Sequence, residues 1–310
     1  MSADGKKILR VFPRRTAATP TDAMIFVGEP PLPGLRPHAD EVHVSVTFSW
    51  DLPAGRRLQR SWQRYYRRVL LGGPATGDPG GQFVPGRYLR TGYTITSRGC
   101  PNGCRNCLVP GREGPLRELR IRDGWDVQDN NLLACSRAHV EAVLEMLRRQ
   151  PQPARFSGGL EARRVSAWFV EAIRHARIGV IYMAFDRPAD WPALVEAVGR
   201  MREAFRWPDG TSRRKLACYV LVAQGPNDTP MAAAERCAAV AELGVSPFPM
   251  YYRPPVETWQ GMPPEWHDMI GRTLRQPWAA GLLSRPMIAD LPLCHGELAD
   301  WRRAVMEIQP

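Results

Sequence analysis

The sequence predicts an α/β fold, namely a partial (βα)6 barrel with a small N-terminal α/β domain and a C-terminal helical cap. Two observations favour this class: β-rich runs alternate with amphipathic helical patterns after Tyr93, and a strand, a helix and an apolar run precede Gly72-Gly73. The chain has 310 residues, of which 44% are hydrophobic and 24% charged, as in globular proteins of this size. The predicted domains are residues 1–90, 91–253 and 254–310.

The predicted N-terminal domain opens with an extended run, ILRVFP, and an alternating strand, EVHVSVTFSW. A basic helical pattern follows from about Leu58 to Val69, and the Pro- and Gly-rich stretch 72–86 is expected to form the domain boundary. Neither GxGxxG nor GxxxxGK[ST] accompanies these elements, so the sequence does not support a nucleotide-phosphate loop.

The β-rich runs from Tyr93 onward are expected to be parallel, because strands joined through helices require right-handed crossovers. A barrel fits this repetition better than an open sheet, which stays an alternative; in both, ligands bind at the carboxyl ends of the strands. The tail is expected to add helices near 263–275 and 295–307. The predicted strands are 93–97, 125–129, 154–159, 179–186, 215–223 and 246–253, and the helices between them lie at about 136–149, 165–176, 190–205 and 229–243.

The positive charge of the chain is unevenly distributed. The formal net charge is +11, and residues 1–99 hold 15 Lys or Arg against 7 Asp or Glu. Arginines interleaved with aromatic residues on the basic helix favour contact with nucleic acid, DNA or RNA. The alternative is codon bias, since only three of the 42 basic residues are lysine. The residues concerned are Arg56, Arg57, Arg60, Arg64, Arg67 and Arg68, with Trp62, Tyr65 and Tyr66.

Targeting signals are not evident. No apolar run approaches the roughly 18 residues of a membrane-spanning helix, and the first residues lack an apolar block of signal-peptide length. We therefore expect a cytoplasmic protein with no membrane partner. Seven cysteines are an odd number, and in a reducing compartment clustered cysteines indicate metal binding or catalysis rather than disulfides.

Three cysteines, Cys100, Cys104 and Cys107, follow the first predicted barrel strand with the spacing C-x3-C-x2-C. Three thiolates on a short Gly/Pro loop can bind three irons of a 4Fe-4S cluster and leave the fourth iron open to an external ligand. A structural zinc site needs a fourth Cys or His, and the loop contains none. The spacing therefore favours a 4Fe-4S cluster, with zinc as the alternative.

At this motif the sequence resembles the radical S-adenosylmethionine (radical SAM) superfamily, over roughly residues 90–253. The resemblance implies that the open iron binds the amino and carboxylate groups of S-adenosylmethionine. One-electron reduction would then cleave this cofactor to a 5′-deoxyadenosyl radical that abstracts a substrate hydrogen, with an external electron donor such as flavodoxin or ferredoxin. The family often carries an aromatic residue before the last cysteine, where this chain has Asn106.

The resemblance also implies cofactor contacts at the ends of later strands. The segment SGGLE is similar to the glycine-glycine-glutamate element of the family but falls on the third predicted strand, whereas the run DNN ends the second. The alternatives are helix capping by Asp129 or Asp186 and a tight turn at the glycines. The cofactor-binding candidates are Asp129, Asn130, Ser157, Gly158, Gly159, Glu161, Arg163, Asp186 and Val222.

Two partial resemblances refine this interpretation. The stretch CLVPGREGPLREL is similar to the cluster loop of methylthiotransferases, but these carry three further cysteines upstream and the first cysteine here is Cys100. The N-terminal domain resembles a shortened cobalamin-binding domain without the D-x-H-x-x-G motif. We therefore expect one cluster and a vestigial cobalamin-like domain.

Two residues are candidates for catalysis. Cys294, beside His295, could return a hydrogen atom, and its alternative is packing. Tyr251 and Tyr252 end the last predicted strand, where alternate residues face inward, so one of them, with Tyr252 as the catalytic candidate, is expected to line the site.

The expected reaction is the modification or rearrangement of a nucleic-acid base, for example a hypermodified pyrimidine in DNA, with arginines positioning the backbone. One alternative is a radical SAM enzyme that modifies a peptide or protein or activates a glycyl-radical enzyme. Another is a non-enzymatic nucleic-acid-binding module with a redox cluster.

Overall fold

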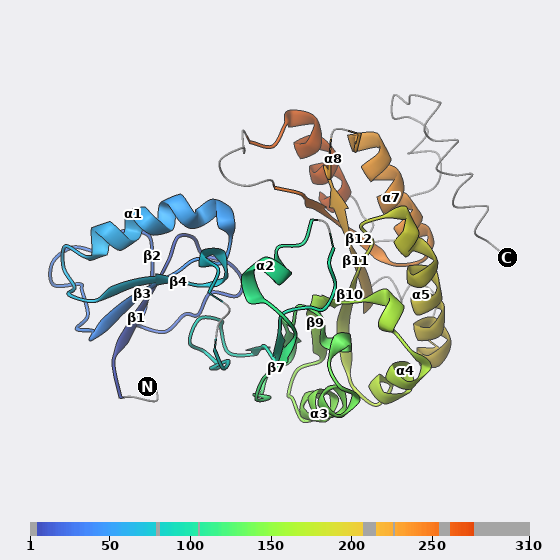
Figure 1. Cartoon of the computed structure of the whole chain (residues 1–310), viewed down its shortest axis with the longest axis horizontal. Helices are drawn as coiled ribbons and strands as arrows, with labels where there is room; N and C mark the ends of the chain where they lie inside the picture. Colours follow the sequence, from blue (N-terminus) through green and yellow to red (C-terminus); the bar gives the residue numbers. More distant parts are fainter. Residues whose placement is uncertain are drawn as a thin grey trace. The chain divides into compact units, whose positions relative to one another are not determined.

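The computed structural model describes residues 5–78, 81–104, 106–206, 215–225, 227–253 and 261–275 (Figure 1). The chain divides into two compact units, one formed by the described residues up to Asn130 and the other by those from Asn131 onward. The architecture is α/β with parallel sheets, as the sequence predicts. Within the described ranges, no helix is long and apolar enough to cross a membrane.

The first unit contains a four-stranded sheet of order β2-β1-β3-β4 in which every pair is parallel. Helix α1 joins β3 to β4 and lies along one face of this sheet (Figure 1). The sequence predicts this strand–helix–strand unit, but β2 has no clear signal because it is only three residues long. The elements are β1 (Ile8–Phe12), β2 (Ile25–Val27), β3 (Glu41–Ser45), α1 (Leu52–Trp62) and β4 (Val69–Gly72).

The core of the first sheet follows from alternation along its strands. The apolar side chains of β1 and β3 that face α1 are fully buried, and Leu58 and Trp62 of α1 pack against them. The Trp62 indole nitrogen donates a hydrogen bond of 3.1 Å to the Gly28 carbonyl, so its one polar atom is satisfied. The strand residues of this core are Leu9, Val11, Val42 and Val44.

The predicted bounds of the basic helix were wrong at both ends. The helix begins at Leu52, where Pro53 suits the first turn because its missing N–H needs no partner there. It ends at Trp62, and Val69 opens strand β4. The recurring arginines after residue 62 continue a helical pattern, but pairing of the apolar run Val69–Gly72 with β3 determines the structure.

The six predicted strands after Tyr93 are all present and lie in chain order in one sheet, β12-β11-β10-β9-β8-β5. The pairs β5/β8, β9/β10, β10/β11 and β11/β12 are parallel. The first two strands are shorter than predicted. The bounds are β5 (Tyr93–Thr94), β8 (Asp126–Val127), β9 (Ala154–Leu160), β10 (Ile178–Ala184), β11 (Leu216–Val222) and β12 (Ser246–Tyr251).

The four predicted helices of the second unit are also present, and three begin with a side-chain cap. The Ser136 hydroxyl accepts from the His139 N–H, that of Ser166 from Phe169 and that of Thr229 from Ala232. Helices α4, α5 and α7 lie along one face of strands β9 to β12 (Figure 1). The bounds are α3 (Arg137–Arg148), α4 (Ala167–Ile173), α5 (Trp191–Phe205) and α7 (Pro230–Glu242).

The tail is described only in part. Helix α8 (Pro264–Arg275) confirms the predicted helix near 263–275, and Trp266 packs edge-on against Tyr251 with ring centroids 5.6 Å apart. The predicted helix at 295–307 and the candidate Cys294 lie outside the described residues. The predicted domain boundaries near residues 90 and 253 remain predictions.

Candidate functional site

The cysteine motif lies on a loop closed by a short hairpin of the first unit. Strand β6 (Ser97–Arg98) pairs antiparallel with β7 (Arg117–Glu118), and the loop between them includes the helix α2 (Val109–Glu113). Arg98 forms an ion pair of 3.3 Å with the buried Glu113. The loop is therefore fastened at its stem.

Gly99 fixes the path of the chain immediately before the first cysteine. Its φ is +79°, and a Cβ there would lie 2.2 Å from the Pro115 carbonyl oxygen and 2.6 Å from that of Gly114. Only glycine fits, because both the backbone angle and the backbone atoms opposite exclude a side chain. The loop structure therefore requires the glycine of the segment SRGC.

Asp129 and Asn130 hold the same stem from the end of β8. The Asp129 carboxylate accepts hydrogen bonds from the Thr96 N–H at 2.6 Å, from the Thr96 hydroxyl and from the Ser97 hydroxyl at 2.8 Å. The Asn130 amide oxygen accepts from the Gly99 N–H at 3.0 Å. Asp129 and Asn130 therefore use their side-chain oxygens to position the cysteine loop. A ligand would have to compete for these same oxygens.

The residue Asp129 is 1% exposed. Burial raises its pKa above the ordinary value, and the hydrogen bonds from Thr96 and Ser97 oppose that shift. Burial of a carboxylate with this many hydrogen-bond donors costs little free energy only while every donor stays in place. Asp129 is thus a structural centre of the loop stem, and it does not cap a helix.

The three motif thiols are more exposed than Cys218 and Cys237. Cys104 and Cys107 are exposed and Cys100 is half-buried, and the Cys107 N–H donates to the Cys104 carbonyl at 3.0 Å. Cys218 and Cys237 are fully buried, and burial raises the pKa of the Cys237 thiol to about 12. Among the cysteines that the structure describes, Cys104 and Cys107 are the exposed ones, so the motif contains the soft donor atoms that a ligand can reach most easily.

The three thiols are not gathered into a metal-binding geometry in this structure. Among the described side chains, no three His, Cys, Asp or Glu residues lie close enough together to hold a metal ion. The donor set itself fits an iron–sulfur cluster, since it comprises three accessible sulfurs on one loop. Binding would require the three side chains to converge.

The glycine run of β9 differs from the Asp129 region. Ser157 and Gly159 are half-buried and Gly158 is exposed. Gly159 has a φ of +90°, and a Cβ there would approach nothing closer than the Tyr219 ring at 3.8 Å. The backbone at the end of β9 is therefore accessible, as a site for close ligand approach requires.

Glu161 and Arg163 are engaged with neighbouring residues of the second unit. The Glu161 carboxylate accepts from the Asn131 amide at 2.8 Å and from Arg164 at 2.7 Å. Arg163 forms an ion pair with Asp190. Both candidates can contact a ligand only through remaining hydrogen-bonding capacity or by exchanging these partners.

Asp186 follows β10 and does not cap the next helix. Its carboxylate accepts from the Leu221 N–H at 3.3 Å, and burial, the largest cause, raises its pKa. The Gln224 side chain donates to the Asp186 carbonyl and to the Leu221 carbonyl. Asp186 thus links the carboxyl ends of β10 and β11.

A buried ion pair fixes the loop after β11, and the sequence analysis missed it. Arg236 of α7 binds Asp228 through two hydrogen bonds of 2.9 and 3.0 Å and donates a third, of 3.1 Å, to the Leu221 carbonyl. The fully buried Val222 side chain lies in this segment, and its carbonyl accepts from the Tyr252 N–H at 2.8 Å. Side-chain contact between Val222 and a ligand is therefore blocked, whereas its backbone belongs to an ordered strand end.

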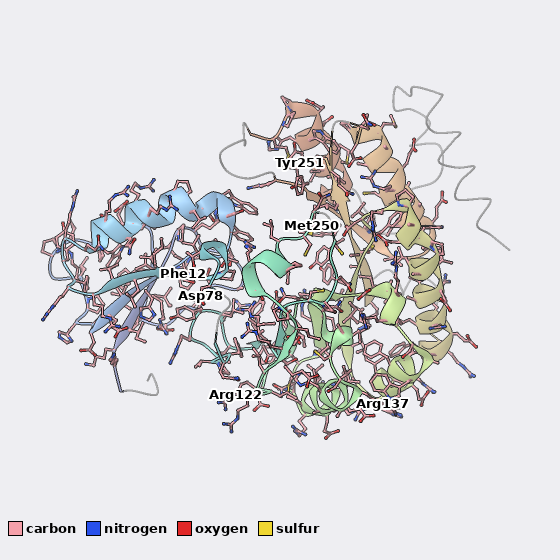
Figure 2. The ribbon with its side chains drawn as sticks, viewed as in Figure 1. Phe12, Asp78, Arg122, Arg137, Met250 and Tyr251 are labelled. Carbon is pink, nitrogen blue, oxygen red and sulfur yellow. The ribbon has the colours of Figure 1, made fainter. Side chains whose placement is uncertain are left out.

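An aromatic cluster on the second unit was also missed. Tyr182 and Tyr219 stack with ring centroids 4.6 Å apart, and Phe248 meets Tyr219 edge-on at 5.7 Å. The Tyr219 hydroxyl donates to the Ser157 carbonyl at 2.8 Å. Phe248 is 40% exposed and Met250, near the end of β12 in Figure 2, is 44% exposed. We call Tyr182, Tyr219 and Phe248 the aromatic cluster.

The aromatic cluster lies on the sheet face opposite the helices. Side chains that alternate with it along β10 and β11, such as Ile181, Cys218 and Val220, are fully buried. Parallel sheets are normally covered on both faces, so accessible aromatic rings on one face indicate a binding surface. Alternation within the predicted strands was the available signal, because it assigns tyrosine and phenylalanine to one face.

No protein-family model matches the chain. No curated protein matches it either. The site must therefore be interpreted from its own chemistry.

Proposed function

We propose that the chain is a radical SAM enzyme that binds a 4Fe-4S cluster through Cys100, Cys104 and Cys107. The observation that carries the proposal is an accessible C-x3-C-x2-C set on one loop, with its stem fastened by Asp129, Asn130 and Gly99. When bound, such a cluster supplies the electron that cleaves S-adenosylmethionine to a 5′-deoxyadenosyl radical. The six strands in chain order, followed by helices, support the partial barrel of this proposal.

The candidate cofactor-binding residues differ in how accessible they are to a ligand. Ser157, Gly158 and Gly159 offer accessible backbone for the amino group of the cofactor's methionine part, whereas Asp129 and Asn130 use their side chains to position the cluster loop. Asp186 and the ordered strand end at Val222 are further candidates for the nucleoside part. Glu161 and Arg163 orient neighbouring side chains.

The substrate proposed is a base of a nucleic acid. The aromatic cluster offers partly exposed ring faces and edges, and planar bases stack on aromatic rings. The net charge of +11 favours a polyanionic partner. Tyr252, half-buried directly after β12, stays the candidate for hydrogen return, and flavodoxin or ferredoxin stays the class of electron donor.

The test is anaerobic reconstitution with iron and sulfide, followed by reduction in the presence of S-adenosylmethionine and quantification of 5′-deoxyadenosine. Wild type is expected to form it and Cys104→Ala is not. Cys135→Ser is the matched control, since Cys135 is a half-buried thiol outside the motif and its loss should leave the product unchanged.

The same assay separates the alternatives. A protein that binds iron but never cleaves the cofactor, with DNA, RNA or peptide present, would be a redox-sensing module rather than an enzyme. Deuterium transfer from a labelled oligonucleotide into 5′-deoxyadenosine supports the nucleic-acid substrate. Transfer only from a labelled peptide would replace it by the peptide-modifying alternative.

A further inference from the structure

Helix α1 and the turn that follows it present a row of exposed arginines. Arg56, Arg57 and Arg60 lie on the helix, and Arg64 and Arg67 lie just beyond its end. Arg56 and Arg60, four positions apart, lie about 6 Å apart along the helix axis, and Arg64 and Arg67 follow in the turn; we call these four residues the arginine strip. The helix sequence LPAGRRLQRSW contains no acidic residue.

Most of this charge is not neutralised within the protein. Arg57 pairs with Glu29 at 3.4 Å, whereas Arg56, Arg60, Arg64 and Arg67 form no ion pair with any residue that the structure describes. The second unit is different. Most exposed arginines of its described helices face a glutamate three or four residues away, as in the pairs Arg137–Glu141, Arg149–Glu145, Arg174–Glu171 and Arg200–Glu196, with Arg202 of α5 as an exception.

This contrast bears on the codon-bias alternative. A bias toward arginine would enrich every surface, yet helix α1 contains no acidic residue, whereas the second unit places a glutamate beside most exposed arginines of its described helices. An unneutralised strip costs self-repulsion in the free protein, and a polyanion removes that cost. The strip is therefore best explained by a partner with regularly spaced negative charges.

A rigid apolar loop lies beside the strip. Leu32 is 74% exposed and Leu35 68% exposed, within the proline-rich segment EPPLPGLRP. The Arg36 guanidinium lies 3.5 Å from the centre of the Tyr65 ring and donates to the Pro31 carbonyl at 2.8 Å. The contact between Arg36 and Tyr65 thus fixes the loop in a conformation in which Leu32 and Leu35 are exposed to solvent.

Two further hydrogen bonds hold this loop. The Leu35 N–H donates to the Leu32 carbonyl at 3.1 Å, which closes a turn, and the Tyr66 hydroxyl donates to the Pro37 carbonyl at 2.8 Å. Proline restricts the backbone further. Apolar side chains held in water in this way indicate a contact surface rather than a mobile loop.

We propose that Arg56, Arg60, Arg64 and Arg67, together with Leu32 and Leu35, form a docking surface for double-helical DNA. The arginines contact phosphates, and the leucines contact base steps in the minor groove, as apolar wedges do in proteins that distort DNA. Single strands are disfavoured because Arg36 already occupies one face of Tyr65, the exposed ring of this surface, which leaves one ring face for stacking with bases. The assignment rests on the proposed nucleic-acid substrate and specifies that this substrate is double-helical DNA.

The test is fluorescence anisotropy of a labelled 20-base-pair DNA duplex with the full chain, at several salt concentrations. The variant Arg60→Gln/Arg64→Gln is expected to lower the slope of log K against log salt by about two, since each phosphate contact contributes about 0.9. The control Arg149→Gln/Arg174→Gln removes the same charge from paired arginines and should leave the slope unchanged. Leu32→Ala/Leu35→Ala should weaken binding at an unchanged slope.

Specific outcomes overturn the inference. If the control double variant lowered the slope of log K against log salt equally, the effect would come from net charge and not from these particular arginines. Tighter binding of an RNA duplex or of single-stranded DNA would reject the double-helical DNA form. The Cys104→Ala protein should bind DNA like wild type, so a failure of cofactor cleavage and a failure of DNA docking are measured separately.

Discussion

The residues that follow β8 and those that end β9 are comparable in sequence, since both are short polar or glycine runs at the end of a parallel strand. The structure gives them different roles. Both carboxylate oxygens of the fully buried Asp129 accept hydrogen bonds from Thr96 and Ser97, whereas a Cβ at Gly159 would meet nothing closer than the Tyr219 ring at 3.8 Å. Side chains such as Asp129, whose hydrogen bonds are all made within the protein, position the binding site. Accessible backbone such as that of Gly159 can contact the ligand itself.

The cysteines give the largest measurable contrast between regions. Alkylation of the iron-free protein at pH 8 is expected to label Cys104 and Cys107 at least about a thousandfold faster than Cys237, whose buried thiol has a pKa of about 12 against an ordinary 9.0. Peptide mapping by mass spectrometry measures each rate.

The same labelling experiment tests the cluster directly. Reconstitution with iron and sulfide should protect Cys100, Cys104 and Cys107 together. Protection of only one or two of them, or of none, would contradict the assignment of all three as ligands.

Removing the Asp129 carboxylate tests the positioning role. Asp129→Ala leaves the Thr96 N–H and two hydroxyls buried without an acceptor, which should lower the free energy of unfolding by about 3 kcal/mol or more. Urea denaturation measures this loss. Asp129→Asn, which keeps the shape and one acceptor, should lose clearly less, and equal losses would argue against the hydrogen-bond network as the cause.

A side chain at Gly159 tests the receiving role. Gly159→Ala places a Cβ on a residue with a φ of +90° and should cost about 1 kcal/mol in unfolding free energy. Its affinity for S-adenosylmethionine, measured by calorimetry on the reconstituted protein, is expected to fall further than this cost. Gly199→Ala, in helix α5 with open space around it, is the control and should be neutral or slightly stabilising.

The smallest expected effect is the pH dependence contributed by Asp186. Because burial raises its folded-state pKa above the ordinary 3.8, the folded protein loses stability as the pH rises from about 3.8 through the raised pKa. Asp186→Asn should remove that decline. Unfolding free energies measured between pH 4 and 7 would show no difference in slope if the group were unperturbed.

Hydrophobic periodicity predicted most of the fold. The strand runs after Tyr93 and their intervening helices alternate clearly, and the cap residues Ser136, Ser166 and Thr229 mark three of the helix starts. The end of α1 was mistaken because the arginine pattern continues past Trp62, while the strand that follows depends on pairing with β3. Propensity cannot reveal such long-range pairing.

The candidate site was predictable only where the residue types carry their own chemistry. The spacing of Cys100, Cys104 and Cys107 indicates a ligand set without any structure. In contrast, the hydrogen bond between Thr96 and Asp129 joins residues 33 positions apart in the sequence. The ion pair of Asp228 with Arg236 depends on which side of helix α7 carries Arg236. The aromatic cluster likewise depends on which residues of three strands share one face.

The central claim is that the cysteine loop binds a cluster with one iron open to S-adenosylmethionine. Electron paramagnetic resonance of the reconstituted, reduced protein tests this most directly. We predict a cluster signal in the wild type that changes when S-adenosylmethionine is added and that is absent in Cys104→Ala. A signal that S-adenosylmethionine leaves unchanged, or one that survives in Cys104→Ala, would contradict the account.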